Sequence, residues 1–328
     1  MERQVHKSNI VAFALSWIIW TLFTFATGIY FQLFLLELGA NTIIVGLVLS
    51  ISTFVIGFSR IIGGYLADYY GRKNIIVILT YVVSFVYLIY AFAPNWTYIL
   101  FGSIIMNISL LYQPAINAIL ADSLPKEKRG IGYAAINVLP SLVVVFAPYL
   151  ALWVVSRYGL LAGMRLLYIG CFLSGITVAT LRLIMLEETL VKKLENKDKL
   201  NNLVVFKHGY VEALRFLFRE LIPLTVLYFT INLAAGISVL TQIYAVKYLG
   251  ITKEEWGWFS FIGAFIYFIS AVPLGYMSDK IGRKKPIFTS LLINFLAVLL
   301  WYYAPNSATK TVILSAVILS NLAGALSS

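Results

Sequence analysis

Long apolar segments occupy most of this sequence, with short polar connections between them. In a bilayer the backbone must satisfy its own hydrogen bonds, which allows helices or closed barrels. The segments are about 19–28 residues long and do not alternate between polar and apolar residues, so they match spanning helices. The expected spans are 9–36, 42–67, 74–92, 96–121, 131–156, 161–186, 221–246, 254–278, 286–304 and 309–328. The sequence therefore predicts an all-α, polytopic membrane protein.

The composition agrees with a lipid-facing exterior. Hydrophobic residues make up 61% of the chain and charged residues 12%, whereas a soluble domain has about 25% charged residues. So few charged residues cannot cover a water-facing surface of this size. The lipid bilayer is thus the first expected partner.

The net charge of +11 would suit a nucleic-acid-binding protein, but the distribution of the charges argues against nucleic acid. Of the 25 lysines and arginines, 19 fall on one side of the expected membrane. This bias is typical of cytoplasmic loops, so it predicts a multi-pass plasma-membrane protein with a cytoplasmic N-terminus. Arg60 lies inside an expected span; we expect a structural role, because its long side chain can reach the membrane surface.

The residues that build metal and catalytic sites are scarce. Cys171 is the only cysteine, and His6 and His208 lie outside the expected spans. No metal, cofactor or catalytic residue is therefore expected, and an enzyme is disfavoured because no cluster of His, Asp or Glu is visible at one depth.

An internal repeat at an offset of 211 residues organises the chain. Matching pairs include Leu38-Gly39 with Leu249-Gly250, Gly46 with Gly257, Asp68 with Asp279, Gly71-Arg72-Lys73 with Gly282-Arg283-Lys284, and Ala93-Pro94-Asn95 with Ala304-Pro305-Asn306. Six expected spans separate the copies, so both copies have the same orientation in the membrane. This pattern indicates a parallel duplication of a six-helix unit.

The repeated loops resemble the signature loop of major facilitator superfamily transporters. The first copy contains Gly64, Asp68, Gly71, Arg72 and Lys73, and the second contains Gly275, Asp279, Gly282, Arg283 and Lys284. The resemblance implies that these loops are gating latches, which hold two helical bundles together on the cytoplasmic side and release as the cavity opens inward. From the residue types, Gly64 and Gly275 are expected to allow close approach of another helix. Gly71 and Gly282 are expected to form tight turns with positive φ.

The resemblance also predicts the domain organisation. It implies a major facilitator fold of two pseudo-repeated six-helix bundles, the second incomplete. The expected parts are a first bundle at 1–187, a cytoplasmic linker with an amphipathic helix at 188–219, and helices 7–10 of the second bundle at 220–328. The offset maps residue 187 to 398, so about 70 further residues are expected in a complete twelve-helix transporter.

In this family, helices 1, 4, 7 and 10 line the substrate cavity. The corresponding spans offer polar and aromatic candidates: Trp17, Thr21, Thr24, Asn107, Gln113, Tyr228, Asn232, Gln242 and Asn321. Each of these side chains could instead bond a neighbouring helix, because buried polar groups need partners. No Asp or Glu lies near the middle of a span, which favours a neutral or weakly polar solute and leaves any coupling ion open.

The leading hypothesis is a secondary transporter of a small solute that works by alternating access. The alternative is a non-transporting membrane receptor or regulator, or an inactive truncated transporter, on the same scaffold.

Overall fold

The computed structural model describes residues 7–124, 140–190, 240–282, 284–306 and 309–327, and isolated residues at 136, 215, 216, 219, 221, 222 and 226. All the regular structure in these residues is helical. Nine of the described helical segments are long and apolar enough to cross a membrane. The predicted linker helix and most of the predicted span 221–246 lie outside the described residues.

The first half of the chain forms one bundle of helices. Its elements are α1 (Lys7–Glu37), α2 (Thr42–Tyr70), α3 (Arg72–Ala91), α4 (Trp96–Ser109), α5 (Gln113–Ser123), α7 (Ala147–Tyr158) and α8 (Leu160–Met185). Helices α1 and α3 both pack against α8. The centre of this bundle is the larger of the two hydrophobic cores.

The second half contributes a smaller group. It contains α11 (Thr241–Ile243), a π-helical turn η3 (Tyr244–Tyr248), α12 (Lys253–Ile281), α13 (Lys284–Tyr303), a 3-10 turn η4 (Ala304–Asn306) and α14 (Thr309–Ser327). Helix α14 packs against both α12 and α13. Thr252 and Glu255 form a capping box that fixes the start of α12.

Two interruptions of the first-half helices coincide with prolines. A 3-10 turn, η1 (Leu110–Tyr112), separates α4 from α5, and Pro114 follows it at the start of α5. Residues 145 and 146 form a turn before α7, in which Pro148 is the second residue. Because proline has no N–H, Pro148 cannot donate to the carbonyl of Val144 four residues earlier.

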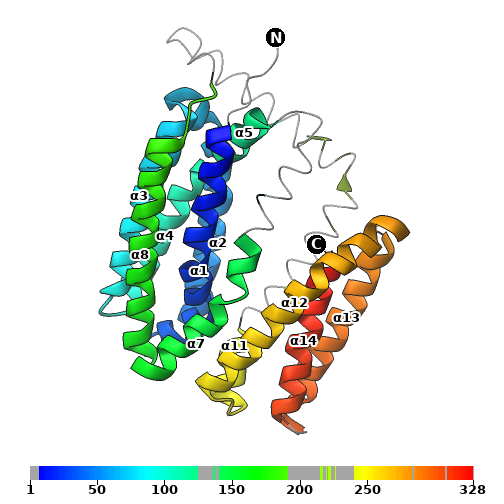
Figure 1. The fold of residues 1–328 in the computed structure, drawn as a ribbon. Helices are drawn as coiled ribbons and strands as arrows, with labels where there is room; N and C mark the ends of the chain where they lie inside the picture. The colour runs from blue at the N-terminus through cyan, green and yellow to red at the C-terminus, as the bar shows by residue number, and fades with distance from the viewer. Residues whose placement is uncertain are drawn as a thin grey trace.

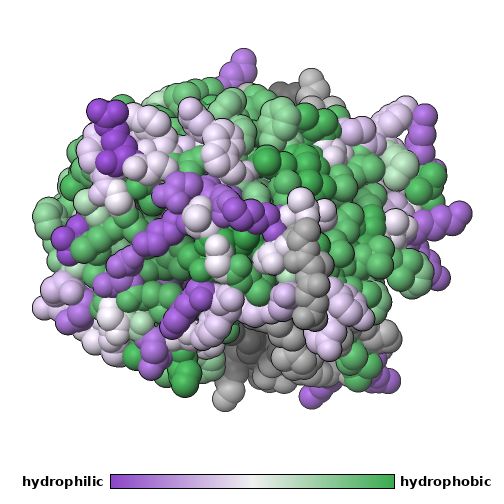
Figure 2. All heavy atoms as spheres, turned by 90° about the horizontal axis from the view of Figure 1, so that it is seen from below, coloured by the Kyte–Doolittle hydropathy of each residue, from purple (hydrophilic) through white to green (hydrophobic). Residues whose placement is uncertain are grey.

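Among the described residues, the two halves meet at one end only. They approach each other where α1 ends and α12 begins, and separate toward the end where α1 begins (Figure 1). We call these the closed end, marked by Tyr30, Glu37 and Lys253, and the open end, marked by Lys7 and Ile281. Figure 2 looks onto the closed end and shows bands of hydrophilic side chains over part of it, interspersed with hydrophobic side chains.

Candidate functional site

The closed end is held by polar contacts between the halves. The hydroxyl of Tyr30 on α1 donates to the carbonyl oxygen of Lys253 at 2.8 Å. The Lys253 ammonium lies 2.7 Å from a carboxylate oxygen of Glu37, the last residue of α1. Tyr30 is fully buried, whereas both members of the ion pair are partly exposed, at 38% and 44%. The hydrogen bond of the buried hydroxyl therefore contributes more to the stability of the closed end than the ion pair does.

One carbonyl of α1 receives two donors from the second half. The Ile29 oxygen accepts a hydrogen bond from the Trp256 indole nitrogen at 3.3 Å and another from the Gln242 side-chain amide. Gln242 is only 4% exposed. Helix α1 is thus bonded to both of the second-half segments that face it at this end.

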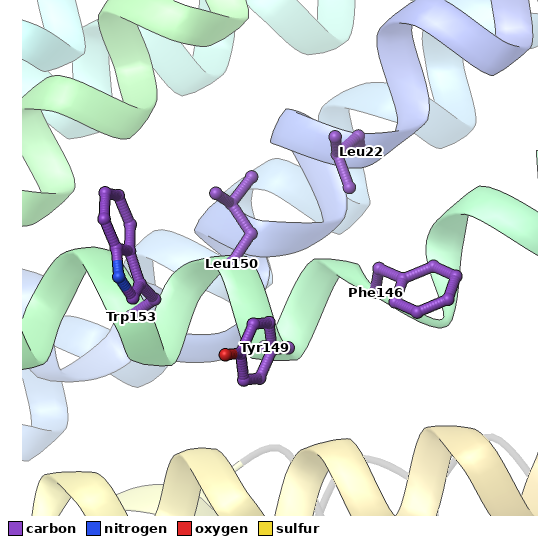
Figure 3. Close-up of a pocket in the computed structure, with 5 residues that line it drawn as sticks. All are labelled: Leu22, Phe146, Tyr149, Leu150 and Trp153. Carbon is purple, nitrogen blue, oxygen red and sulfur yellow. The ribbon is translucent and has the colours of Figure 1, made fainter.

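Helices α7 and α12 close the same end with aromatic contacts. Figure 3 shows Tyr149 on the side of α7 that faces α12. Its ring centroid lies 5.8 Å from that of Phe261 and 6.3 Å from that of Trp258. Beside this seam lies a shallow hollow of about 270 Å³, lined by Leu22, Phe146, Tyr149, Leu150 and Trp153. These side chains are apolar or aromatic, which suits a lipid-facing surface.

A larger cavity of about 850 Å³ lies between the halves, on the open-end side of these contacts. It is within the range of small-molecule sites in proteins. Its walls come from α1, the helical segment around residues 140–148, α12 and α14, with Thr241 and Trp301 completing it. Five aromatic rings line it, namely Phe25, Trp256, Tyr267, Phe268 and Trp301.

Charged side chains are absent from the described lining of this cavity. Its polar groups include the indole N–H groups of Trp256 and Trp301, and the hydroxyls and one amide of Thr21, Ser141, Thr241, Ser260, Tyr267, Ser320 and Asn321. The Thr21 hydroxyl donates to the Trp17 carbonyl at 2.6 Å, and the Asn321 amide to the Val317 carbonyl at 2.9 Å. Both side chains therefore keep an oxygen acceptor for a bound molecule.

Of the nine candidate cavity residues, Thr21 and Asn321 line the cavity. Trp17, Thr24, Asn107, Gln113 and Gln242 are not among the residues that line it. The Thr24 hydroxyl and the Asn107 amide bond carbonyls of their own helices, Trp17 packs against Phe13, and Gln113 begins α5. Tyr228 and Asn232 lie outside the described residues.

Sequence reasoning missed the contribution of α12. This helix provides seven lining residues, more than α1 or α14. The residue pattern held a signal, because Ser260, Ala264 and Phe268 recur every four residues and so share one face of the helix.

The loop at 64–73 makes described bonds within its own half. The Arg72 guanidinium lies 2.7 Å from a carboxylate oxygen of Asp122, and the Lys73 backbone N–H donates to Glu188 at 3.0 Å. The side chains of Asp68 and Asp279, and all of Arg283, lie outside the described part of the chain.

The glycines of both loops can be compared with the expectations. Gly71 and Gly282 have φ of 93° and 83°, the positive values that a tight turn requires. The close approach expected at Gly64 and Gly275 stays a prediction, since no described atom lies within 4 Å of a Cβ built at either glycine. A close approach occurs one residue earlier, at Gly63, where a Cβ would collide with the Leu111 carbonyl of η1.

A buried arginine inside the first bundle was also missed. The sequence groups Arg182 with the cytoplasmic-side cations, but the side chain is only 2% exposed. It donates to the Thr80 hydroxyl at 2.8 Å and to the Ser16 hydroxyl at 3.3 Å. Its guanidinium carbon lies 5.7–5.8 Å from three ring centroids, those of Phe13, Trp20 and Tyr112. Hydroxyls and aromatic faces thus stabilise a charge that would be costly in hydrocarbon.

The described residues offer no group of three His, Cys, Asp or Glu that could hold a metal ion.

Comparison with known proteins agrees with this geometry. The family model described as Major Facilitator Superfamily matches residues 10–328. An uncharacterized MFS-type transporter of Bacillus subtilis is 32% identical over 120 residues, which cover 35% of this chain and 28% of that protein. A second one, of Methanocaldococcus jannaschii, is 25% identical over 289 residues, which cover 85% of this chain and 72% of that protein. The chain thus spans little more than a quarter of the first relative's length.

A solved structure shows the same fold. The xylose transporter of E. coli, in a partially occluded inward-open conformation, superposes with a TM-score of 0.68 at 15% identity, covering 98% of this chain and 81% of that one. A family model that matches almost the entire sequence is the stronger finding. This chain belongs to the Major Facilitator Superfamily, and it is a membrane protein of the transporter fold.

Proposed function

We propose that this chain is a secondary transporter that moves a small, neutral or weakly polar solute across the plasma membrane by alternating access. The observation that carries the proposal is the combination of a cavity of about 850 Å³ between the halves with a closure of that cavity at one end only. A cavity without charged lining residues in the described part of the chain favours an uncharged solute.

The charge bias of the sequence supports an orientation for the two ends. It assigns Lys7, at the open end, to the cytoplasmic side, so the closed end faces outward. We therefore interpret this conformation as inward-open. Alternating access requires a second conformation in which the closed-end contacts of Tyr30, Lys253 and Trp256 separate.

We further propose that the loops at 64–73 and 275–284 act as cytoplasmic latches. The described bonds of Arg72 and Lys73 within their own half suit a released latch, as an inward-open conformation requires. Asp279→Asn should then favour the inward-open conformation. Equal reactivity of cysteines at open-end cavity positions in the variant and the parent would argue against the latch.

The transport proposal is tested by flux into proteoliposomes. A thermal-stabilisation screen of uncharged solutes first identifies a ligand, and radiolabelled uptake of that ligand is then measured with and without a proton or sodium gradient. Saturable uptake supports transport, and dependence on a gradient identifies a coupling ion. A ligand that stabilises the protein but is never moved would instead support the non-transporting receptor.

A matched pair of threonine variants links uptake to the cavity. Thr21 lines the cavity and Thr53, on α2, does not, although each hydroxyl bonds the carbonyl four residues earlier. Thr21→Val should raise the KM for the solute about fivefold or more, because the loss of one hydrogen bond of ~1 kcal/mol weakens binding by that factor. Thr53→Val should leave the KM unchanged. Equal effects of the two variants would remove the cavity from the uptake pathway.

A further inference from the structure

The cavity has a side wall made by two helical arms that diverge. One arm is the segment around residues 140–148, which continues into α7, and the other is α12. The arms touch at the closed end through Tyr149, Trp258 and Phe261. Away from that contact they separate on the side facing the viewer in Figure 1.

The interruption before α7 lies in a segment that borders both the large cavity and the shallow outer hollow. Pro140, Ser141, Val144, Val145 and Pro148 line the large cavity, and Phe146 and Tyr149 line the hollow. Residues 145 and 146 are not helical. This arm therefore separates the cavity from the outer surface by a single, interrupted helix.

The opposite arm presents the same kind of surface. Val272 on α12 lines the cavity and is also 72% exposed. It lies nine residues before the end of α12 at Ile281, which is ~14 Å along the helix axis. This depth is inside the hydrocarbon region of a bilayer rather than at its surface. An exposed apolar side chain at this depth suits contact with acyl chains.

The lining between the arms is mainly apolar on both sides, with the Ser141 and Tyr267 hydroxyls as its polar groups. Pro140 and Val144 face the cavity from one arm, and Phe268, Ala271 and Val272 from the other. Water forms few hydrogen bonds with such a lining. A lipid-soluble molecule, in contrast, passes from the acyl chains to these side chains with little cost in free energy. The five aromatic rings of the cavity then offer it stacking surfaces.

We infer that the substrate is an uncharged, lipid-soluble molecule with an aromatic or extended apolar part, and that it enters the cavity from the bilayer between these two arms. The inference rests on the proposed function, since it names the solute class and the route to the same cavity. We call the gap between residues 140–144 and 264–272 the lateral opening.

The test measures access to the cavity and does not depend on transport. Ser260 lines the cavity on α12, and the native Cys171 is fully buried. A Ser260→Cys variant in nanodiscs is labelled either with N-(1-pyrenyl)maleimide, an uncharged aromatic reagent that partitions into lipid, or with a water-soluble cationic methanethiosulfonate. The parent protein gives the background from Cys171.

Two substitutions block the lateral opening, one from each arm: Val272→Trp and Ser141→Trp. Ile269→Trp is the matched control, because Ile269 lies on α12 and is 55% exposed but is not among the residues that line the cavity. Both blocking variants should slow pyrenyl labelling about tenfold, which corresponds to a barrier higher by ~1.4 kcal/mol. They should leave aqueous labelling unchanged, and the control should affect neither reagent.

Unchanged pyrenyl labelling in either blocking variant would overturn the lateral route, since the reagent would then reach Ser260→Cys another way. Equal slowing of both reagents would also overturn it, because that result indicates a filled cavity. Unchanged aqueous labelling serves as the check that each variant is folded. Failure of the route leaves saturable uptake intact, whereas failure of transport leaves the labelling pattern intact, so the two proposals are separable.

Discussion

Gly257 is a position where the two halves approach closely, and an added methyl group there should force them apart. A Cβ at Gly257 on α12 would collide with the Tyr30 hydroxyl and would lie 2.9 Å and 3.1 Å from two carbons of Leu152. Tyr30 belongs to α1 and Leu152 to α7, so both neighbours come from the opposite half. Gly257→Ala should therefore destabilise the closed end specifically.

The size of the effect follows from crowding and from one hydrogen bond. Overpacking a well-packed site costs about 1–3 kcal/mol. Tyr30 is also held by its bond to the Lys253 carbonyl at 2.8 Å, and moving it leaves a buried hydroxyl without its partner. A conformation with separated closed-end contacts bears neither cost. A shift of ~1–3 kcal/mol changes the ratio of the two conformations about 5- to 150-fold.

The assay is the distance between spin labels on the two halves. Ile43, near the start of α2, and Tyr302, near the end of α13, are both at the closed end and are 80% and 73% exposed. Labelled cysteines at these positions in nanodiscs should show one short distance in the parent. In Gly257→Ala a longer distance should become a major population.

Gly263→Ala is the control for general destabilisation. A Cβ at Gly263 would lie 2.5 Å from the Asn321 amide nitrogen and 2.9 Å from Val317, both in α14 of the same half. This variant should lower the unfolding temperature without changing the label distance. If Gly257→Ala behaves in the same way, the closure is not set by this contact and the reasoning is wrong.

Substitutions at three further contacts give separate tests. Glu37→Gln removes a partly exposed ion pair with Lys253. It should change the free-energy difference between the two conformations, read from the populations of label distances, by less than about 1 kcal/mol, and by less still in high salt. A larger change that does not depend on salt would contradict this. Arg72→Gln and Asp122→Asn should each lower the unfolding temperature, and the double variant should lose little more, because the two share one contact; additive losses would refute the pairing. Arg182→Ala should cost ~3–5 kcal/mol of stability and Arg182→Met far less. An equally severe methionine variant would mean that the charge itself is required.

The helical topology could be predicted because it depends on local features. The length of each apolar run predicts a spanning helix. Gly71 and Gly282 end helices because glycine, which has no side chain, adopts the positive φ found there. These features act within one helical turn, so the sequence contains the information that determines them. The interruption before α7 was not part of the expected span 131–156, and Pro273 inside the continuous helix α12 shows that a proline alone does not determine one.

The cavity could be predicted only in part, because lipid-facing and interior positions are equally apolar in a membrane protein. Helices α1 and α12 are apolar around their whole circumference, and their sequences do not show which face meets the other half. Hydroxyls were an ambiguous guide for a second reason. Thr21 and Thr24 both bond their own helix, yet only Thr21 is among the residues that line the cavity.

Arg182 shows the same limit for charges. Its position near the end of α8 suggested a cation at the membrane surface. The structure corrects this assignment, since Arg182 is buried, whereas Arg60, whose side chain was expected to extend toward the surface, is exposed. The direction of a long side chain decides the difference. That direction depends on the hydroxyls of Ser16 and Thr80, which come from helices remote in sequence.

The internal repeat explains the topology, and the differences between its copies explain the conformation. Gly46 and Gly257 are equivalent at the offset of 211, yet no described atom lies within 4 Å of a Cβ at Gly46, whereas Gly257 is crowded by Tyr30 and Leu152. Two equivalent helices thus have different environments in a single structure. Both glycines lie at the closed end, so among the described residues this end is held on the α12 side and not on the α2 side. The crowded glycine therefore marks the contact that must break for the closed end to open.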